Sequence, residues 1–145
     1  MNFPKPSRVE NLKKFIKDNF EVELPVSGGW GYSEDDIVFI EQSNLPIKQI
    51  EHIFATIRAN ISMNLLLPKE DKYGGINLKE KSREEKDGIE IVEYIVEAIK
   101  NDIYEELINE YKAGYGKDDF DMEAHFKKRE DATLRVVERF YFKIA

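Results

Sequence analysis

Residues 133–144, T-L-R-V-V-E-R-F-Y-F-K-I, alternate between two sets of side chains, and this alternation restricts the fold more than any other feature. The sets are Leu134, Val136, Glu138, Phe140, Phe142 and Ile144, against Thr133, Arg135, Val137, Arg139, Tyr141 and Lys143. A period of two is the period of a β-strand, and one mainly apolar face is typical of an antiparallel sheet covered on one side. We therefore predict a long antiparallel strand here.

Three further strands are predicted from shorter patterns. Residues 20–24 (F-E-V-E-L) alternate, and residues 36–41 (D-I-V-F-I-E) are rich in β-branched and aromatic side chains. Residues 89–99 fit two structures, because their glutamates have helical spacing while their β-branched content and the preceding glycine favour a strand. We predict a strand for this segment as well.

The segment 49–67 is also ambiguous. Four apolar residues between 50 and 57 have helical spacing, but alternate apolar residues from Ile53 to Leu65 fit a strand over a longer span. The longer pattern favours a strand. Beyond it, Tyr73-Gly74-Gly75 predicts a turn, and the charged residues 79–88 predict an exposed connection with at most a helical turn.

Helices are predicted in three places. Ser7 and Glu10 have the spacing of a capping box, so a helix is expected over 7–19. Residues 102–114 form an acidic amphipathic pattern that ends at a glycine, and 119–128 favour another short helix. Together the elements predict an α+β fold, a single domain over 1–145, with a mainly antiparallel sheet packed against an N-terminal helix and the acidic helix.

Composition excludes several classes of protein. The chain has 145 residues, 41% of them hydrophobic, which suffices for one domain with its own core. Because cysteine is absent, disulfides, thiolate metal sites and cysteine nucleophiles are excluded. No apolar run reaches the roughly 18 residues that span a bilayer, and no secretory signal is evident, so we expect a cytoplasmic protein that does not enter membranes.

The net charge of −7 is concentrated in one segment. From Glu84 to Glu110 there are ten acidic residues and two lysines, which gives −10 + 2 = −8. An acidic surface repels phosphate backbones and anionic lipid, so nucleic acid and membrane partners are not expected. A basic protein is the expected partner, and a merely solvated surface is the alternative.

The S-G-G-W-G-Y-S stretch at 27–33 matches no known nucleotide or nucleophile motif. A P-loop requires a lysine, and none lies between Lys17 and Lys48; the third glycine of a dinucleotide fingerprint and a G-x-S-x-G elbow are also missing. No cofactor is therefore predicted. Glycine permits positive φ and close backbone approach, so we expect an ordered loop that buries Trp30.

His52 and His125 are the two imidazoles, and neither belongs to a recognisable catalytic or metal-binding pattern. The acidic residues preceding His125 lack the glycine and glutamate spacing of an EF-hand loop. No metal and no catalytic residue are predicted. A small hydrolase that uses His125 with nearby acids stays open as an alternative function.

The order L-P-V-S-G-G-W-G-Y-S-E-D-D at 24–36, Y-G-G-I-N at 73–77 and an acidic D-I-Y-E-E-L helix resembles a family of bacterial immunity proteins. These proteins are found in polymorphic toxin and contact-dependent growth inhibition loci. The resemblance implies a cytoplasmic, non-enzymatic protein that binds and neutralises a cognate toxin C-terminal domain. Such a domain, a nuclease for example, would be basic.

The predicted partner-binding surface joins the acidic helix to two acidic loops, with two tyrosines as anchors. Its residues are Tyr32, Glu34, Asp35, Glu105, Glu106, Glu110, Tyr115, Asp118, Asp119 and Asp121. These residues form one surface only if both loops lie at the same end of the sheet. An acidic regulatory or structural subunit with another partner is the second alternative.

Overall fold

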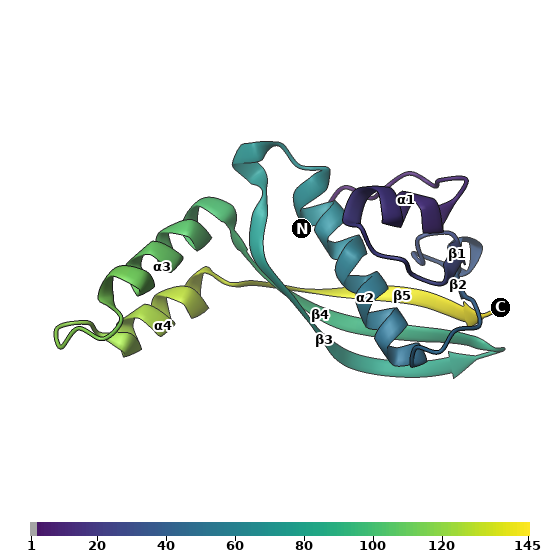
Figure 1. Ribbon diagram of the computed structural model, residues 1–145. Coiled ribbons are helices and arrows are strands. Elements are labelled where there is room, and N and C mark those ends of the chain that lie inside the picture. The colour runs from purple at the N-terminus through teal and green to yellow at the C-terminus, as the bar shows by residue number, and fades with distance from the viewer. Residues whose placement is uncertain (1–2) are drawn as a thin grey trace.

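Four helices and a five-stranded mixed sheet make up the computed structural model, which describes residues 3–145 (Figure 1). The helices are α1 (Leu12–Phe20), α2 (Ile47–Asn60), α3 (Asn101–Gly114) and α4 (Met122–Ala132). The strands are β1 (Val26–Gly28), β2 (Val38–Ile40), β3 (Tyr73–Lys86), β4 (Ile89–Lys100) and β5 (Leu134–Ile144). The predicted α+β class is confirmed.

Strand β5 occupies the centre of the sheet, whose order is β1-β2-β5-β4-β3. It pairs antiparallel with β4, from Ala98 opposite Leu134 to Glu90 opposite Phe142, and parallel with β2. Strands β3 and β4 form a long antiparallel hairpin, and β1 pairs antiparallel with β2. The strands predicted at 89–99 and 133–144 are therefore confirmed, and three of the four pairings are antiparallel.

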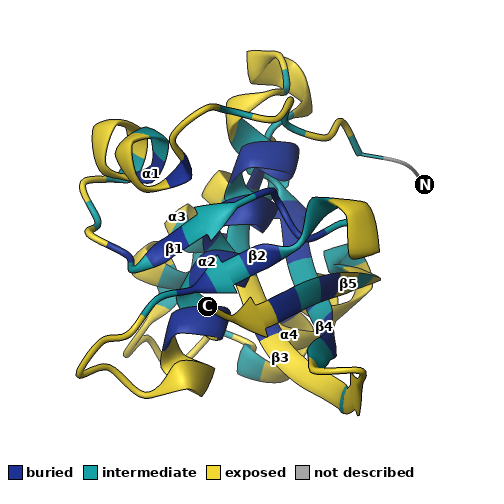
Figure 2. Ribbon diagram, turned by 90° about the vertical axis from the view of Figure 1, so that its right-hand side faces the viewer, coloured by how far each residue is buried: buried dark blue, intermediate teal, exposed yellow. Residues whose placement is uncertain are grey.

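The core lies between α2 and the sheet, and Figure 2 shows the buried residues gathered there. Phe54 of α2 packs edge-on against Phe140 and Phe142 of β5, with ring centroids 6.4 and 5.9 Å away. Because side chains alternate along a strand, every second residue of β4 faces the side of the sheet away from α2. In contrast to α1 and α2, helices α3 and α4 project away from this core as a hairpin (Figure 1).

The strand predicted over 49–67 is wrong, because this segment is α2 followed by a π-helical turn over Ile61–Leu65. Ile50, Phe54, Ile57 and Ile61 are buried at helical spacing. The π-turn adds a residue to the turn and so brings Met63 inward as well, which extends the apolar pattern beyond one regular helix. The alternation in the sequence therefore begins within α2 and continues through the π-turn.

The predicted turn at 73–75 and connection at 79–88 are also wrong, because residues 73–86 form β3 and only Asp87 and Gly88 form the turn to β4. The glycines serve close packing: a Cβ at Gly74 would lie 2.6 Å from the Tyr104 ring of α3. The charged residues beyond them lie on the outermost strand of the sheet, where most of them are exposed. Charged side chains on an edge strand oppose pairing with other chains.

The first helix begins later than predicted. Helix α1 starts at Leu12, where the side chain of Asn11 accepts a hydrogen bond from the Lys14 amide, so the Ser7 capping box does not form. The carbonyl of Ser7 instead accepts a hydrogen bond from the indole of Trp30.

Three other predicted elements differ from the structure. The strand predicted at 20–24 is wrong, because Phe20 ends α1 and residues 21–25 are irregular; β1 follows at Val26–Gly28. The predicted strand at 36–41 shortens to Val38–Ile40, and the short helix predicted at 119–128 is α4, over Met122–Ala132. The helix predicted at 102–114 is confirmed as α3.

Candidate partner-binding surface

The glycine-rich loop is a structural element that fixes Trp30 in the core. Gly28 and Gly31 have φ of 88° and 83°, values that L-amino acids rarely adopt. Trp30 is 1% exposed, stacks on Phe54, and donates its indole N–H to the Ser7 carbonyl at 3.0 Å. The predicted ordered loop around a buried tryptophan is confirmed.

Substitution Gly28→Ala is expected to lower the free energy of unfolding by at least about 1 kcal/mol. The alanine would have to adopt positive φ, and its Cβ would lie 2.6 Å from the Ile37 carbonyl oxygen. The matched control is Gly116→Ala, where φ is +82° and nothing lies within 4 Å of the added Cβ. Urea denaturation should show a larger loss for Gly28→Ala; equal losses would contradict the role of the close contact.

Arg58 holds this loop to α2 and β5. Its guanidinium donates to the Trp30 carbonyl at 3.1 Å and to the Arg139 carbonyl at 2.8 Å, and it lies 3.4 Å from the Glu138 carboxylate. It also stacks between the rings of Tyr32 and Phe140, at 3.9 and 3.4 Å from their centroids. Arg58 is 2% exposed, and burial lowers its pKa to about 10, so it stays charged at neutral pH.

Tyr32 is engaged within the protein and does not project as a free anchor. One side of its ring contacts Arg58, Lys5 lies 4.8 Å from its centroid, and its hydroxyl lies 3.4 Å from that of Ser62. Burial raises the pKa of Tyr32. Tyr32 therefore belongs to the residues that support the glycine-rich loop.

Helices α3 and α4 and the turn between them, residues 101–132, form the feature that we call the arm. Leu107 of α3 is buried, and the Tyr104 ring lies where Gly74 and Gly75 leave no side chain. The arm contains ten acidic and five basic residues, a net charge of −10 + 5 = −5 out of −7 for the chain. Most of the excess negative charge is thus on one projecting element (Figure 1).

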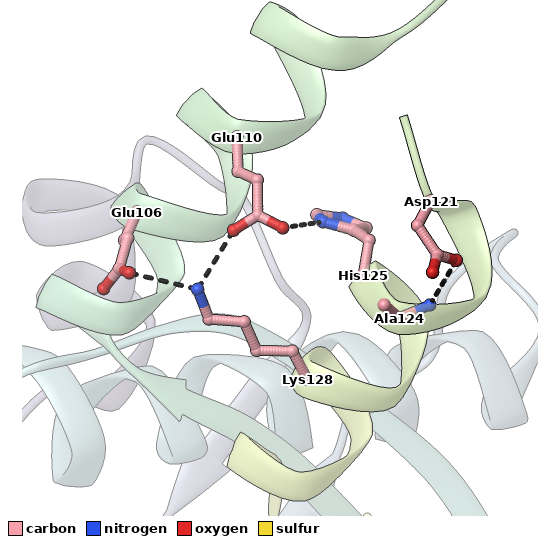
Figure 3. A network of polar contacts seen from close by, with 6 residues as sticks. All are labelled: Glu106, Glu110, Asp121, Ala124, His125 and Lys128. Atoms are coloured by element: carbon pink, nitrogen blue, oxygen red, sulfur yellow. Dashed lines mark hydrogen bonds and ion pairs between the residues drawn. The ribbon is translucent and has the colours of Figure 1, made fainter. Parts of the chain in front are cut away.

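Polar contacts hold the two helices of the arm together (Figure 3). Lys128 of α4 lies 3.1 Å from Glu106 and 3.0 Å from Glu110 of α3, and His125 Nδ1 lies 3.3 Å from Glu110. The hydrogen bonds from Lys128 and His125 lower the pKa of Glu110. His125 is 3% exposed and contacts the rings of Tyr111 and Phe120. These residues therefore brace the arm.

The structure brings together seven of the ten predicted site residues on the arm: Glu105, Glu106, Glu110, Tyr115, Asp118, Asp119 and Asp121. Asp121 caps α4 by accepting a hydrogen bond from the Ala124 amide at 3.0 Å (Figure 3). Within residues 3–145, no hydrogen bond or ion pair engages the side chains of Glu105, Asp118 or Asp119, which are exposed. Tyr115, at 68% exposure, precedes the two aspartates.

Glu34 and Asp35 do not join this surface, so the predicted single acidic surface is wrong. They form a 3-10 turn over Glu34–Asp36, between β1 and β2, at the end of the sheet away from the arm (Figure 1). Their position follows from the pairing of β1 with β2, which the sequence pattern did not reveal.

The acidic segment from Glu84 to Glu110 also does not form one face. Glu93 and Glu97 of β4 pair with Arg139 and Arg135 of β5, at 3.4 and 3.5 Å. Glu90 lies 3.2 Å from Arg83 of β3. Glu90, Glu93 and Glu97 thus have basic partners on other strands, whereas Glu84, Glu85 and Asp87 of the β3–β4 hairpin are exposed and, within residues 3–145, unpaired.

Both histidines make contacts within the protein. His52 Nε2 lies 3.2 Å from the Leu78 carbonyl, and His125 is enclosed within the arm. Among the described residues 3–145, no group of three or more His, Asp or Glu side chains is arranged to hold a metal ion. No helix in that range combines the length and apolar character required to cross a bilayer.

Comparison of the sequence and structure with protein-family models, curated proteins and solved structures gives no significant match.

Proposed function

We propose that this protein binds a basic protein domain through the arm, as an immunity protein binds and neutralises its cognate toxin domain. The observation that carries the proposal is the cluster of exposed, unpaired acids around Tyr115, on an element with most of the excess charge. The resemblance of the G-G-W-G-Y-S region to immunity proteins is the reason for proposing a toxin domain as this partner.

The construction of the arm supports a binding role. Lys128, Glu106 and Glu110 join the two helices, so the exposed acids are presented from a braced scaffold. A braced surface loses less conformational entropy on binding than a flexible one. Complementary charge also accelerates encounter with a basic partner and disfavours other acidic proteins.

The size of the arm indicates how a partner would contact it. Helix α3 has 14 residues, so it is about 21 Å long at 1.5 Å per residue, and two adjacent helices are roughly 20 Å wide. One flank therefore offers roughly 400 Å², about half of a standard contact of ~800 Å² per partner. We expect the partner to cover the tip at 115–121 as well as a flank, with Tyr115 as an apolar anchor.

The geometry disfavours the alternative of a hydrolase that uses His125. Its imidazole is enclosed by aromatic rings and lies beside Glu110, so a substrate has little access to it. An acidic regulatory subunit would use the same arm, and only the identity of the partner separates it from an immunity protein.

The proposal is tested by co-expression with the candidate toxin. The candidate is the C-terminal domain of a large secreted protein encoded immediately upstream, if that domain is basic. We expect the two to co-purify in equal amounts, and cells that express the toxin domain to grow only with this protein present. If both proteins are expressed at normal levels but form no complex, and growth is not rescued, the immunity assignment is refuted.

A further inference from the structure

A buried cluster of charged groups joins α2 to the β3–β4 hairpin. Glu51 of α2 is 0% exposed, and its carboxyl lies 2.9 Å from Nη1 of Arg83 on β3. The same guanidinium lies 2.6 Å from Glu80 of β3 and 3.2 Å from Glu90 of β4. Three carboxyl groups thus surround one arginine.

The charges of this cluster do not balance if every acid is ionised. Three carboxylates and one guanidinium would leave −3 + 1 = −2 beside a side chain that water does not reach. Burial of unbalanced charge is costly, and carboxylates that share a site disfavour each other's ionisation. One carboxyl is therefore expected to keep its proton.

Glu51 is the carboxyl that best accounts for the geometry. Neither of its oxygens, nor Oε2 of Glu90, has a well-directed hydrogen bond from a donor among residues 3–145. A proton on Glu51 would give it an O–H that can donate to Glu90, so that one oxygen of each carboxyl gains a partner. Burial, reinforced by Glu90, raises the pKa of Glu51 to about 8.

We propose that a proton held by Glu51 fastens α2 to the β3–β4 hairpin, and that release of this proton loosens the edge strand β3. Other ionisable groups face the cluster. Burial and the nearby glutamates raise the pKa of Tyr94 on β4, whose ring contacts His52. The hydrogen bond from Arg83, with a smaller contribution from Lys48, lowers the pKa of Glu80. This inference does not depend on the proposed function.

The direction of the pH effect follows from proton binding. Between about pH 4.5 and 8, folded Glu51 keeps a proton that the unfolded chain releases. Stability is therefore lost as the pH rises through this window, and the unfolding equilibrium constant increases up to about tenfold per pH unit.

Substitution Glu51→Gln tests the proposal, because glutamine has a similar shape, can donate to Glu90 and does not ionise. Urea denaturation from pH 6 to 8 should show an unfolding equilibrium constant that rises about 50-fold more for the native protein than for Glu51→Gln. Glu84→Gln is the matched control, since Glu84 lies exposed on the same strand and has no ion pair within residues 3–145, and it should keep the native slope. Parallel pH profiles for the native protein and Glu51→Gln would overturn the proposal.

A second measurement uses the native protein and tests the proposal even if Glu51→Gln does not fold. NMR titration of the native protein, with ¹³C-labelled glutamate, should show one carboxyl that titrates above pH 7, accompanied by faster hydrogen exchange of β3 amides. If all the Glu carboxyls titrate below pH 6, the proposal is wrong.

Discussion

Substitution Arg58→Ala is expected to lower the free energy of unfolding by about 3–5 kcal/mol. Two backbone carbonyls, of Trp30 and Arg139, would lose the donor that now satisfies them. The space between Tyr32 and Phe140 would also become a cavity, because the guanidinium fills it.

Two controls separate this role from a general effect of removing an arginine. Arg139→Ala removes a more exposed guanidinium that pairs with Glu93, and should cost less than about 1 kcal/mol. Arg58→Lys keeps the charge but loses the planar fork, so we expect an intermediate loss. Urea denaturation followed by the fluorescence of Trp30 measures all three. A loss below 1 kcal/mol for Arg58→Ala would show that the loop does not depend on this arginine.

The long central strands were predictable because their local pattern agrees with their environment. Strand β5 has one face against α2, so burial alternates along it, and β4 is sufficiently β-branched to outweigh the spacing of its glutamates. Strand β3 was not predictable in the same way, since its charged residues from Lys79 to Lys86 fall on both faces of this edge strand and leave no apolar alternation.

Helix α2 was missed although its sequence contained two useful signals. Glu51 and Arg58 are charged residues within an apolar helical stripe, where they fall beside Phe54 and Ala55. Charged residues in such positions require partners from elsewhere in the fold. Those partners lie on β3 and β5 and in the glycine-rich loop. The sequence could therefore indicate that Glu51 and Arg58 need partners, but not which residues provide them.

The candidate surface was predictable only in part for a related reason. The acids of the arm are close in sequence or joined by one helical hairpin, so local pattern was sufficient to group them. Whether Glu34 and Asp35 joined them depended on where the sheet places its two ends, which is a property of the whole topology. The pairing of Glu93 and Glu97 with β5 likewise depended on strand register.

The double substitution Asp118→Lys/Asp119→Lys is expected to slow association with the basic partner domain by about tenfold or more at low ionic strength. Neither aspartate is paired within residues 3–145, so their reversal should leave the arm folded, unlike reversal of Glu106 or Glu110. The matched control is Glu34→Lys/Asp35→Lys, which changes the net charge equally at the other end of the molecule.

Stopped-flow association rates of the native protein and both double variants, measured at several salt concentrations, test the central claim most directly. We expect the arm variant alone to associate slowly at low salt, and the difference from the native protein to shrink as salt screens the charges. If the two variants slow association equally, or if neither variant nor salt changes the rate, the arm is solvated surface and not the partner-binding site.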